Sequence, residues 1–150
     1  MPATARQTLG DLGERLVTKL ACPKCKNERS LKRLPRNFKC ADIICDFCGY
    51  LAQVKATTTN SIDTPPTRLL GAAWEPQNLR MQAGIYFPLF FVLVSENRRK
   101  RSIWYLPADL QTPAIFKKRN PLSSDARRAG WTGYLIDLSV EGAHPPVRLQ

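Results

Sequence analysis

Four cysteines fall into two short motifs that have the residue type and the spacing of a metal site. The motifs are Cys22-Pro-Lys-Cys25 and Cys45-Asp-Phe-Cys48, and 19 residues separate them. A spacing of two residues lets both sulfurs of one turn reach the same ion, and four thiolates are the preferred shell of structural, tetrahedral zinc. Because that shell leaves no position for water, we expect a zinc ion that stabilises the fold. The alternative is a set of buried free cysteines, and the odd cysteine, Cys40, is expected to be a core side chain.

An aspartate and a lysine next to the second cysteine motif have the types that phosphodiester hydrolysis needs. Asp42 precedes the motif, and Gln53-Val54-Lys55 follows it. Residues two apart in a strand share a face, so Gln53 and Lys55 should point together while Val54 points into the core. The Asp42 carboxylate, the Gln53 amide oxygen and the Val54 carbonyl could hold a Mg2+ or Mn2+ ion beside a scissile phosphate. Lys55 would then orient or activate the attacking water.

The same residues also have a simpler interpretation. An aspartate followed eleven residues later by Gln-x-Lys is a permissive pattern, so Asp42 could be a turn residue and Lys55 an exposed strand residue. Glu14, in the first amphipathic segment, is a further candidate. A helix carboxylate that faces the strands could bind metal directly or through water, or it could simply be solvated.

A helix and two strands would position these side chains. Residues 8–20 place leucines near one helical face, and Pro23 predicts that the helix ends before it. Residues 36–44 and 50–56 predict two short strands that are joined through the second cysteine motif, where Gly49 permits the turn. The zinc would fix this hairpin, and with it the register of Asp42 against Gln53 and Lys55.

The remaining patterns predict one α/β domain with a central mixed sheet that helices flank. Residues 85–94 are apolar without alternation, which predicts a strand buried on both faces, and residues 103–106 would be its partner. Further expected elements are a loop at 57–66, a helix at 67–81 that Pro76 kinks or divides, a short helix at 107–116, a basic loop at 117–120, a strand at 134–138 and a loosely held segment after Gly142.

Composition and charge point to a globular protein with a polyanionic partner. The hydrophobic fraction is 43%, too high for a disordered chain. The net charge of +11 favours a phosphate backbone as partner, although a merely basic surface is the alternative. Five cysteines without an apparent signal peptide predict a reducing, cytoplasmic location. The longest apolar run, 85–94, is too short to span a bilayer.

In these residues, the chain resembles the Dam-replacing (DpnI-like) family of methyl-directed restriction endonucleases, within the PD-(D/E)xK nuclease superfamily. The resemblance covers nearly the whole chain. Its most specific parts are the two cysteine motifs, ADIIC with Asp42 followed by the QVK strand, YLPADLQTPAIFKKRNPL, and Ala126-Arg-Arg-Ala-Gly-Trp131 leading into Ile136-Asp-Leu138. It implies Mg2+-dependent cleavage of double-stranded DNA at GATC sites with N6-methylated adenine, and a structural zinc.

The resemblance also implies roles for single residues. Asp42 and Lys55 match the family's catalytic aspartate and lysine, and the four cysteines match its zinc ligands. Trp131 matches a tryptophan that packs against the methyl groups of the duplex. An indole offers a broad apolar face to an N6-methyl group in the major groove, although Trp131 could instead be a core aromatic. Candidate contacts to guanine or phosphate are Arg127 and Arg128, and candidate contacts to the DNA backbone are Lys117, Lys118, Arg119 and the cluster 98–101.

Two departures from the family pattern keep alternatives open. Gln53 stands where the family has glutamate, and an amide is a weaker metal ligand than a carboxylate. The family's full-length enzymes also carry a C-terminal winged-helix domain, whereas this sequence ends at Gln150, so we expect residues 1–150 to form the nuclease domain alone. Besides the endonuclease, a zinc-stabilised reader of methylated DNA that does not cut and a nuclease of the same fold with another DNA target stay possible.

Overall fold

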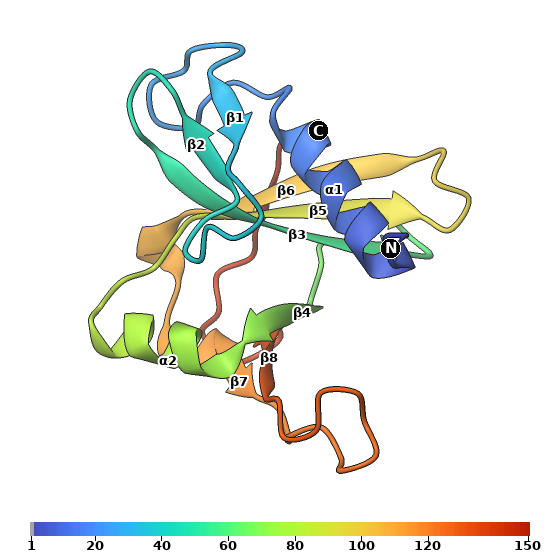
Figure 1. Ribbon diagram of the computed structural model, residues 1–150. Coiled ribbons are helices and arrows are strands. Elements are labelled where there is room, and N and C mark those ends of the chain that lie inside the picture. Colours follow the sequence, from blue (N-terminus) through green and yellow to red (C-terminus); the bar gives the residue numbers. More distant parts are fainter. Residues whose placement is uncertain (1) are drawn as a thin grey trace.

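The computed structural model describes residues 2–150, which form two β-sheets, one below the other in Figure 1, with one helix beside each sheet. The helices and strands in chain order are α1 (Ala5–Val17), β1 (Leu31–Arg33), β2 (Ile43–Cys45), β3 (Leu51–Thr59), β4 (Arg68–Ala73), α2 (Trp74–Gln82), β5 (Leu89–Ser95), β6 (Arg101–Leu106), β7 (Phe116–Lys118), β8 (Gly133–Asp137) and β9 (Val147–Arg148). The expected α/β class is confirmed. Neither helix of the described residues has the length and apolar character needed to cross a membrane.

The larger sheet is mixed, as expected. Its strand order is β1-β2-β3-β5-β6-β9. Strands β3 and β5 are parallel, and the other neighbours are antiparallel. Because parallel neighbours need a crossover, the chain leaves this sheet after β3, builds β4 and α2 in the lower layer, and returns as β5. The smaller sheet has the order β4-β8-β7 and is antiparallel throughout.

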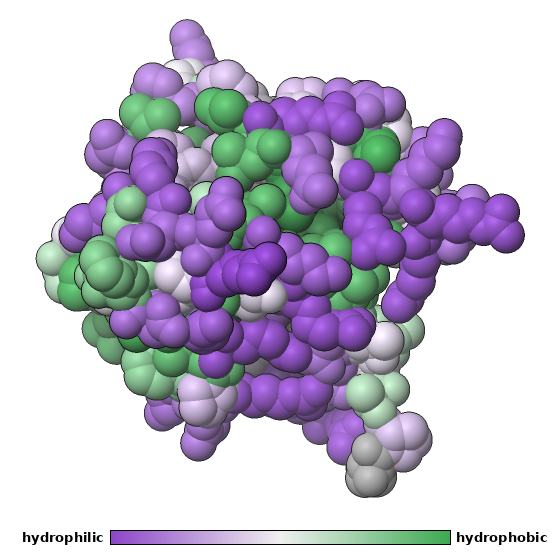
Figure 2. Space-filling view, turned by 90° about the horizontal axis from the view of Figure 1, so that it is seen from above, coloured by the Kyte–Doolittle hydropathy of each residue, from purple (hydrophilic) through white to green (hydrophobic). Residues whose placement is uncertain are grey.

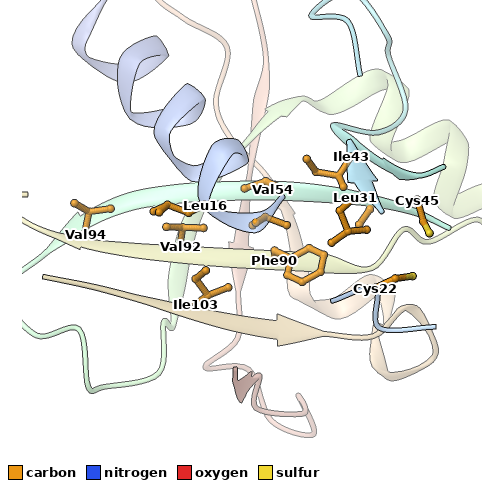
Figure 3. Close-up of a cluster of buried hydrophobic side chains, with 12 residues drawn as sticks. Leu16, Cys22, Leu31, Ile43, Cys45, Val54, Phe90, Val92, Val94 and Ile103 are labelled. Carbon is orange, nitrogen blue, oxygen red and sulfur yellow. The ribbon is translucent and has the colours of Figure 1, made fainter. Parts of the chain in front are cut away.

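Strand β5 is buried on both faces, as its unbroken apolar run predicts. Phe90, Val92 and Val94 belong to a core cluster with Leu16 of α1 (Figure 3). Their neighbours Leu89, Phe91 and Leu93 belong to a second cluster with residues of the smaller sheet. Each face of the larger sheet therefore has its own core, because successive side chains of a strand point in opposite directions.

Helix α1 begins earlier and ends earlier than the leucine pattern predicts. Thr4 and Gln7 form a capping box, in which each side chain accepts a hydrogen bond from the backbone N–H of the other. The helix ends at Val17, although Leu20 still packs against the core. Gly13 faces β3, and a Cβ atom added there would lie 2.9 Å from the Cβ of Ala56. The absence of a side chain at Gly13 therefore sets how closely α1 approaches the sheet.

The expected helix at 67–81 is wrong in its first half. Residues 68–73 form β4, which pairs with β8, and only Trp74–Gln82 is helical. Pairing with a strand far along the chain outweighs local helix propensity. Gly71 suits this strand because a Cβ there would lie 2.1 Å from the ring of Tyr134. Pro76 is the third residue of α2, a first-turn position whose N–H has no intrahelical acceptor, so it does not kink the helix.

Five other expectations also need correction. Residues 36–42 are not a strand, because they begin in a turn in which Phe38 N–H donates to the Pro35 carbonyl, and β2 starts only at Ile43. Strand β3 extends through 57–59, which were expected as loop. Two separate 3₁₀ turns replace the short helix at 107–116, since Gln111 between them is extended. The start of the expected basic loop is strand β7, and the segment after Gly142 is held through the pairing of β9 with β6.

Candidate functional site

The two cysteine motifs meet and form one cluster. The Sγ atoms of Cys22 and Cys48 are 3.7 Å apart, as are those of Cys25 and Cys45. All four sulfurs lie within 4.8 Å of one another. A zinc ion with four sulfurs at about 2.3 Å would place neighbouring sulfurs about 3.8 Å apart. The cluster therefore fits a tetrahedral ion of this size.

The two motifs share one backbone conformation. Cys22 N–H donates to the Asn27 carbonyl, and Lys26 N–H donates to the Cys22 carbonyl. The second motif repeats both bonds, from Cys45 N–H to the carbonyl of residue 50 and from Gly49 N–H to the Cys45 carbonyl. Lys26 and Gly49 occupy the same place and have positive φ, 66° and 76°. Each turn thus presents its two sulfurs in the same way.

The cysteine cluster is joined to the upper core, which is the core cluster that contains Leu16, Phe90 and Val92. Cys22 and Cys45 are fully buried among the same apolar side chains as Leu31 and Ile43 (Figure 3). Burial opposes ionisation of Cys45, but its hydrogen bonds with the Ser30 side chain and with nearby backbone N–H groups lower its pKa to about 6, whereas burial raises the pKa of Cys48 to about 12. A low pKa favours the thiolate, which is the form that binds metal. Cys40 belongs to neither core cluster, so its expected core position is wrong.

Asp42, Gln53 and Lys55 line one cleft of about 330 Å³ between the two sheets. Residues from the smaller sheet and α2 form its opposite wall, namely Ala72, Ala73, Pro76, Arg80 and Tyr134. The alternation of β3 produces this arrangement, since Ala52 and Val54 are buried while Gln53 and Lys55 are half-buried. The expectation that Gln53 and Lys55 share a face away from the core is therefore confirmed.

The backbone of β3 fixes the Asp42 carboxylate. Strands β2 and β3 pair through only two residue pairs, Ile43 with Ala52 and Ile44 with Leu51. Beyond them, Asp42 N–H donates to the Ala52 carbonyl at 3.0 Å, and Asp42 Oδ2 accepts the Val54 N–H at 2.8 Å. No hydrogen bond to Asp42 Oδ1 occurs within residues 2–150. One oxygen of this carboxylate is therefore anchored and the other is available.

Gln53 and the Val54 carbonyl can supply two further oxygens. Gln53 Nε2 donates to the Cys40 carbonyl at 3.0 Å, which leaves Gln53 Oε1 without a donor among the described residues. Gln53 N–H donates to Pro88 of the chain leading into β5, so the backbone groups of Val54 face the opposite edge, where Asp42 lies. Carboxylate, amide and carbonyl oxygens are the ligands that Mg2+ takes in proteins, so this donor set fits the ion.

Lys55 and Glu14 differ in whether their charged groups already have a partner among the described residues. Within residues 2–150, the Lys55 ammonium makes no ion pair or hydrogen bond. Glu14 lines a neighbouring pocket of about 210 Å³ that Asp42 also lines, but it does not line the cleft. Arg33 donates two hydrogen bonds to Glu14 Oε2, at 2.7 and 2.9 Å. Burial raises the pKa of Glu14 and outweighs the opposing effect of Arg33. Glu14 is thus close to Asp42 but already paired.

The basic segment around residues 119–132 extends the β7–β8 pair away from the sheets (Figure 1). Arg119 N–H donates to Gly133, and Leu122 N–H donates to Trp131. The Arg128 guanidinium lies over the Trp131 ring, 4.4 Å from its centroid. The far edge of the same ring packs against Gly133, where an added Cβ would lie 2.8 Å away. Trp131 is therefore a half-buried loop residue and not a core aromatic.

The other candidate DNA contacts fall into two groups. Lys118, Arg119 and Arg127 are exposed, as is the cluster 98–101 in the β5–β6 turn. Lys117 instead donates to Asp137 Oδ2 at 3.0 Å, and Asp137 is buried. The structure gives Lys117 a partner within the protein. Lys117 thus contributes to the packing of β7 against β8.

The wall of the cleft contains residues that the sequence motifs did not indicate. Arg80 lines the cleft, and its guanidinium donates to the Lys39 carbonyl at 2.6 Å. Tyr134 also lines it, from a strand that was expected without a functional role. Both residues reach the site through the pairing of β4 with β8. No local pattern encodes that pairing, so only a correct topology could have found them.

A family model described as DpnI, the Dam-replacing family, matches residues 4–145. The matched segment includes the cysteine cluster, the inter-sheet cleft and the basic loop. The family indicates a nuclease of the restriction type that acts on DNA. Since the match covers far more than half of the 150 residues, the chain belongs to the Dam-replacing family.

Proposed function

We propose that residues 1–150 act as one metal-dependent endonuclease domain of the PD-(D/E)xK type, which hydrolyses phosphodiester bonds of duplex DNA at GATC sites with N6-methyladenine. The observation that carries this proposal is the shared cleft of Asp42, Gln53 and Lys55 between the two sheets. These residues supply two oxygen ligands and a cation at one place, which is the set that phosphodiester hydrolysis requires.

Each residue of the cleft has a separate task in this reaction. A bound Mg2+ or Mn2+ ion would supply charge neutralisation and a more acidic water. The anchored Asp42 carboxylate and the amide oxygen of Gln53 would hold that ion together with the Val54 carbonyl. The Lys55 ammonium orients the attacking water and stabilises the charge that develops on the phosphate.

We assign zinc to the four-cysteine cluster. The four sulfurs and their spacing, which fits a tetrahedral ion, support this assignment. A zinc ion there would clamp the loop between α1 and β1 to the turn between β2 and β3. Because Asp42 directly precedes β2, the clamp would also maintain its position against Gln53.

The basic loop is proposed to contact the DNA. Trp131 would read the methyl group, and Lys118, Arg119 and Arg127 would contact phosphates. Arg128 already covers one face of the indole. A methyl group that packs on this face would have to replace the guanidinium, which would then be free for a guanine or a phosphate.

Cleavage of adenine-methylated and unmethylated plasmid, in parallel and with or without added Mg2+ or Mn2+, tests the proposal. We expect metal-dependent linear product from the methylated plasmid alone. Equal cutting of both plasmids would favour a nuclease with another target. Binding to the methylated plasmid without any product would favour a reader that does not cut, which is the function that Gln53 leaves open.

Substitution of the indole tests the proposed readout. Trp131→Ala should reduce the ratio of methylated to unmethylated cleavage, while its affinity for unmethylated duplex should change little. Trp131→Phe keeps an aromatic face and should retain part of the preference. An unchanged preference in Trp131→Ala would remove this residue from methyl recognition.

A further inference from the structure

One edge of β3 is open beyond the catalytic residues. Strand β2 covers β3 only at residues 51 and 52, whereas β3 continues to Thr59. Gln53 N–H faces β5, so the N–H groups of Ala56 and Thr58 face the uncovered edge. Neither N–H has an acceptor outside the β3–β5 pair within residues 2–150. Two backbone donors are thus available along this edge.

A groove of about 450 Å³ follows the open edge. Its walls come from the first half of α1, from β3, from Leu70 and Gly71 of β4, and from Arg98 of the β5–β6 turn. Lys55 lines both this groove and the cleft with Asp42. The groove is therefore a direct continuation of the proposed active site.

The charge of the groove favours a polyanion. Among the described residues that line it, Arg6, Lys55 and Arg98 are cationic and none is acidic. No ion pair of Arg6 or Arg98 occurs within residues 2–150. Three more exposed cations, residues 99–101, follow Arg98 at the end of the β5–β6 turn and the start of β6. Figure 2 shows hydrophilic side chains that project at the right, the side on which this turn lies in Figure 1.

We infer that this groove binds the phosphates of the DNA strand that flank the scissile position. The inference rests on the proposed function and adds to it a binding surface for one strand of the substrate. Arg6 and Arg98 approach the groove from α1 and from the β5–β6 turn, so they can clamp one strand between them. The N–H groups of Ala56 and Thr58 can donate to the phosphate oxygens in between.

A matched pair of double variants tests the groove. Arg6→Gln with Arg98→Asn removes the two groove cations, and asparagine suits residue 98 because its φ is 60°. Arg15→Gln with Lys19→Gln is the control, since it removes the same charge from two exposed residues that are not candidate DNA contacts. Arg15 lies about two and a half turns after Arg6 and therefore on the opposite face of the helix. Neither control residue lines the groove.

Binding of a methylated duplex over a range of salt concentrations, without the catalytic ion, is the measurement. We expect the groove variant to bind roughly tenfold more weakly and to lower the slope of log affinity against log salt by about 2, because two phosphate contacts are lost. The control should retain affinity within about twofold, as exposed charges far from the DNA contribute little. Arg6→Lys with Arg98→Lys should preserve the slope.

Shortening the duplex gives a second readout that separates a local contact from a general charge effect. Removal of the flanking phosphates on one side of the site should weaken binding by the wild-type protein but not by the groove variant. Equal losses in the groove variant and the control, or equal sensitivity of both to duplex length, would overturn the inference. Absence of binding and cleavage by the wild-type protein would instead refute the proposed function.

Discussion

Asp42 and Gln53 use one polar atom for structure and leave another for chemistry. The Val54 N–H anchors Asp42 Oδ2, and the Cys40 carbonyl anchors Gln53 Nε2. The remaining oxygens, Asp42 Oδ1 and Gln53 Oε1, are available to a cation. Such anchoring fixes the orientation of the ligands before a metal arrives, which reduces the reorganisation that binding requires.

Gln53→Glu should strengthen the metal site but weaken the metal-free protein. A carboxylate is the better Mg2+ ligand, so cleavage should reach half its maximum at lower Mg2+ concentration. Glutamate cannot donate to the Cys40 carbonyl, and this loss should lower the free energy of unfolding without Mg2+ by about 1–3 kcal/mol. Cleavage rates over a Mg2+ titration and urea unfolding with and without Mg2+ measure both effects.

Gln82→Glu is the matched control for this change, because Gln82 is exposed at the end of α2. It adds the same charge and should leave the Mg2+ dependence as it is. A Gln53→Glu variant that behaved like this control would show that residue 53 is not a metal ligand.

The sequence predicts the orientation of the side chains on β3 better than it predicts the partners of side chains on other elements. The alternation of residues 52–56 correctly places Gln53 and Lys55 on one face, because strand geometry depends only on neighbouring residues. The partners of Lys117 and Glu14 do not follow from local pattern. Asp137 and Arg33 lie 20 and 19 residues away along the chain, and only the strand pairing and the packing of α1 bring them close.

At the scale of elements, the contact between α1 and β3 determines where the helix can lie. Gly13 lies directly against Ala56 of β3, which leaves no room for another carbon atom. An added Cβ at Gly10, one turn earlier, would have no atom from outside its own stretch of helix within 4 Å among the described residues. The two glycines share one helix but differ in their surroundings, so they separate helix propensity from packing.

Gly13→Ala and Gly10→Ala should change stability in opposite directions. Alanine at residue 10 should raise the free energy of unfolding by about 0.5–1 kcal/mol, because it reduces the freedom of the unfolded chain. Alanine at residue 13 should lower it by about 1–3 kcal/mol, because overpacking must push α1 away from Ala56. Urea unfolding of both variants measures the difference. A stabilised Gly13→Ala variant would contradict the close approach of α1.

The β7–β8 pair contains a buried carboxylate that makes stability depend on pH. Hydrogen bonds from Ser139 and from Lys117 hold the pKa of Asp137 below its usual range. The ionised carboxylate therefore stabilises the folded protein above the unfolded pKa of about 3.9, and this contribution is lost as the pH falls below that value. Asp137→Asn should lower the free energy of unfolding at neutral pH, because the amide cannot replace the charged acceptor of these hydrogen bonds.

The difference between wild-type protein and Asp137→Asn should narrow in acid, as the wild-type protein loses the same contribution. Urea unfolding at neutral pH and at about pH 3, below the unfolded pKa, gives this comparison. A difference that stays constant over this range would show that ionisation of Asp137 does not stabilise the fold.

The sequence predicts a strand correctly where all its side chains are buried. It fails where the strand's hydrogen-bond partner lies far along the chain. The apolar run of β5 is sufficient to predict a strand buried on both faces. Residues 68–73 contain leucine and alanine, which favour a helix, yet β8 supplies the hydrogen-bond partners for a strand. The opposite wall of the cleft depends on that strand. The sequence therefore predicts one side of the candidate site but not the other.

On the scale of the whole molecule, the cysteine cluster connects the hairpin of β2 and β3 to the upper core. Two of its cysteines are fully buried in that core, and the two motifs come from segments on either side of β1. Few apolar side chains hold β1 and β2, which have three residues each. A bound metal is thus the main link that we expect to hold the hairpin in place.

Cys48→Ser should remove the metal and destabilise the protein, whereas Cys40→Ser should not affect metal content. A structural zinc contributes on the order of 10–16 kcal/mol to folding, and loss of one thiolate should remove much of it. Metal analysis of the purified proteins should find about one zinc per chain in the wild-type protein and in Cys40→Ser. Equal zinc content in Cys48→Ser would show that the cluster is not the binding site.

Cleavage of methylated duplex by Lys55→Ala, with DNA binding measured on the same samples, tests the central claim most directly. Lys55 has no structural partner within residues 2–150, so its replacement should leave the fold nearly unchanged and should weaken DNA binding far less than cleavage. We predict a loss of at least about a hundredfold in the rate of metal-dependent cleavage, since the alanine cannot stabilise charge at the phosphate. Full cleavage by Lys55→Ala would contradict an active site in the cleft between the two sheets.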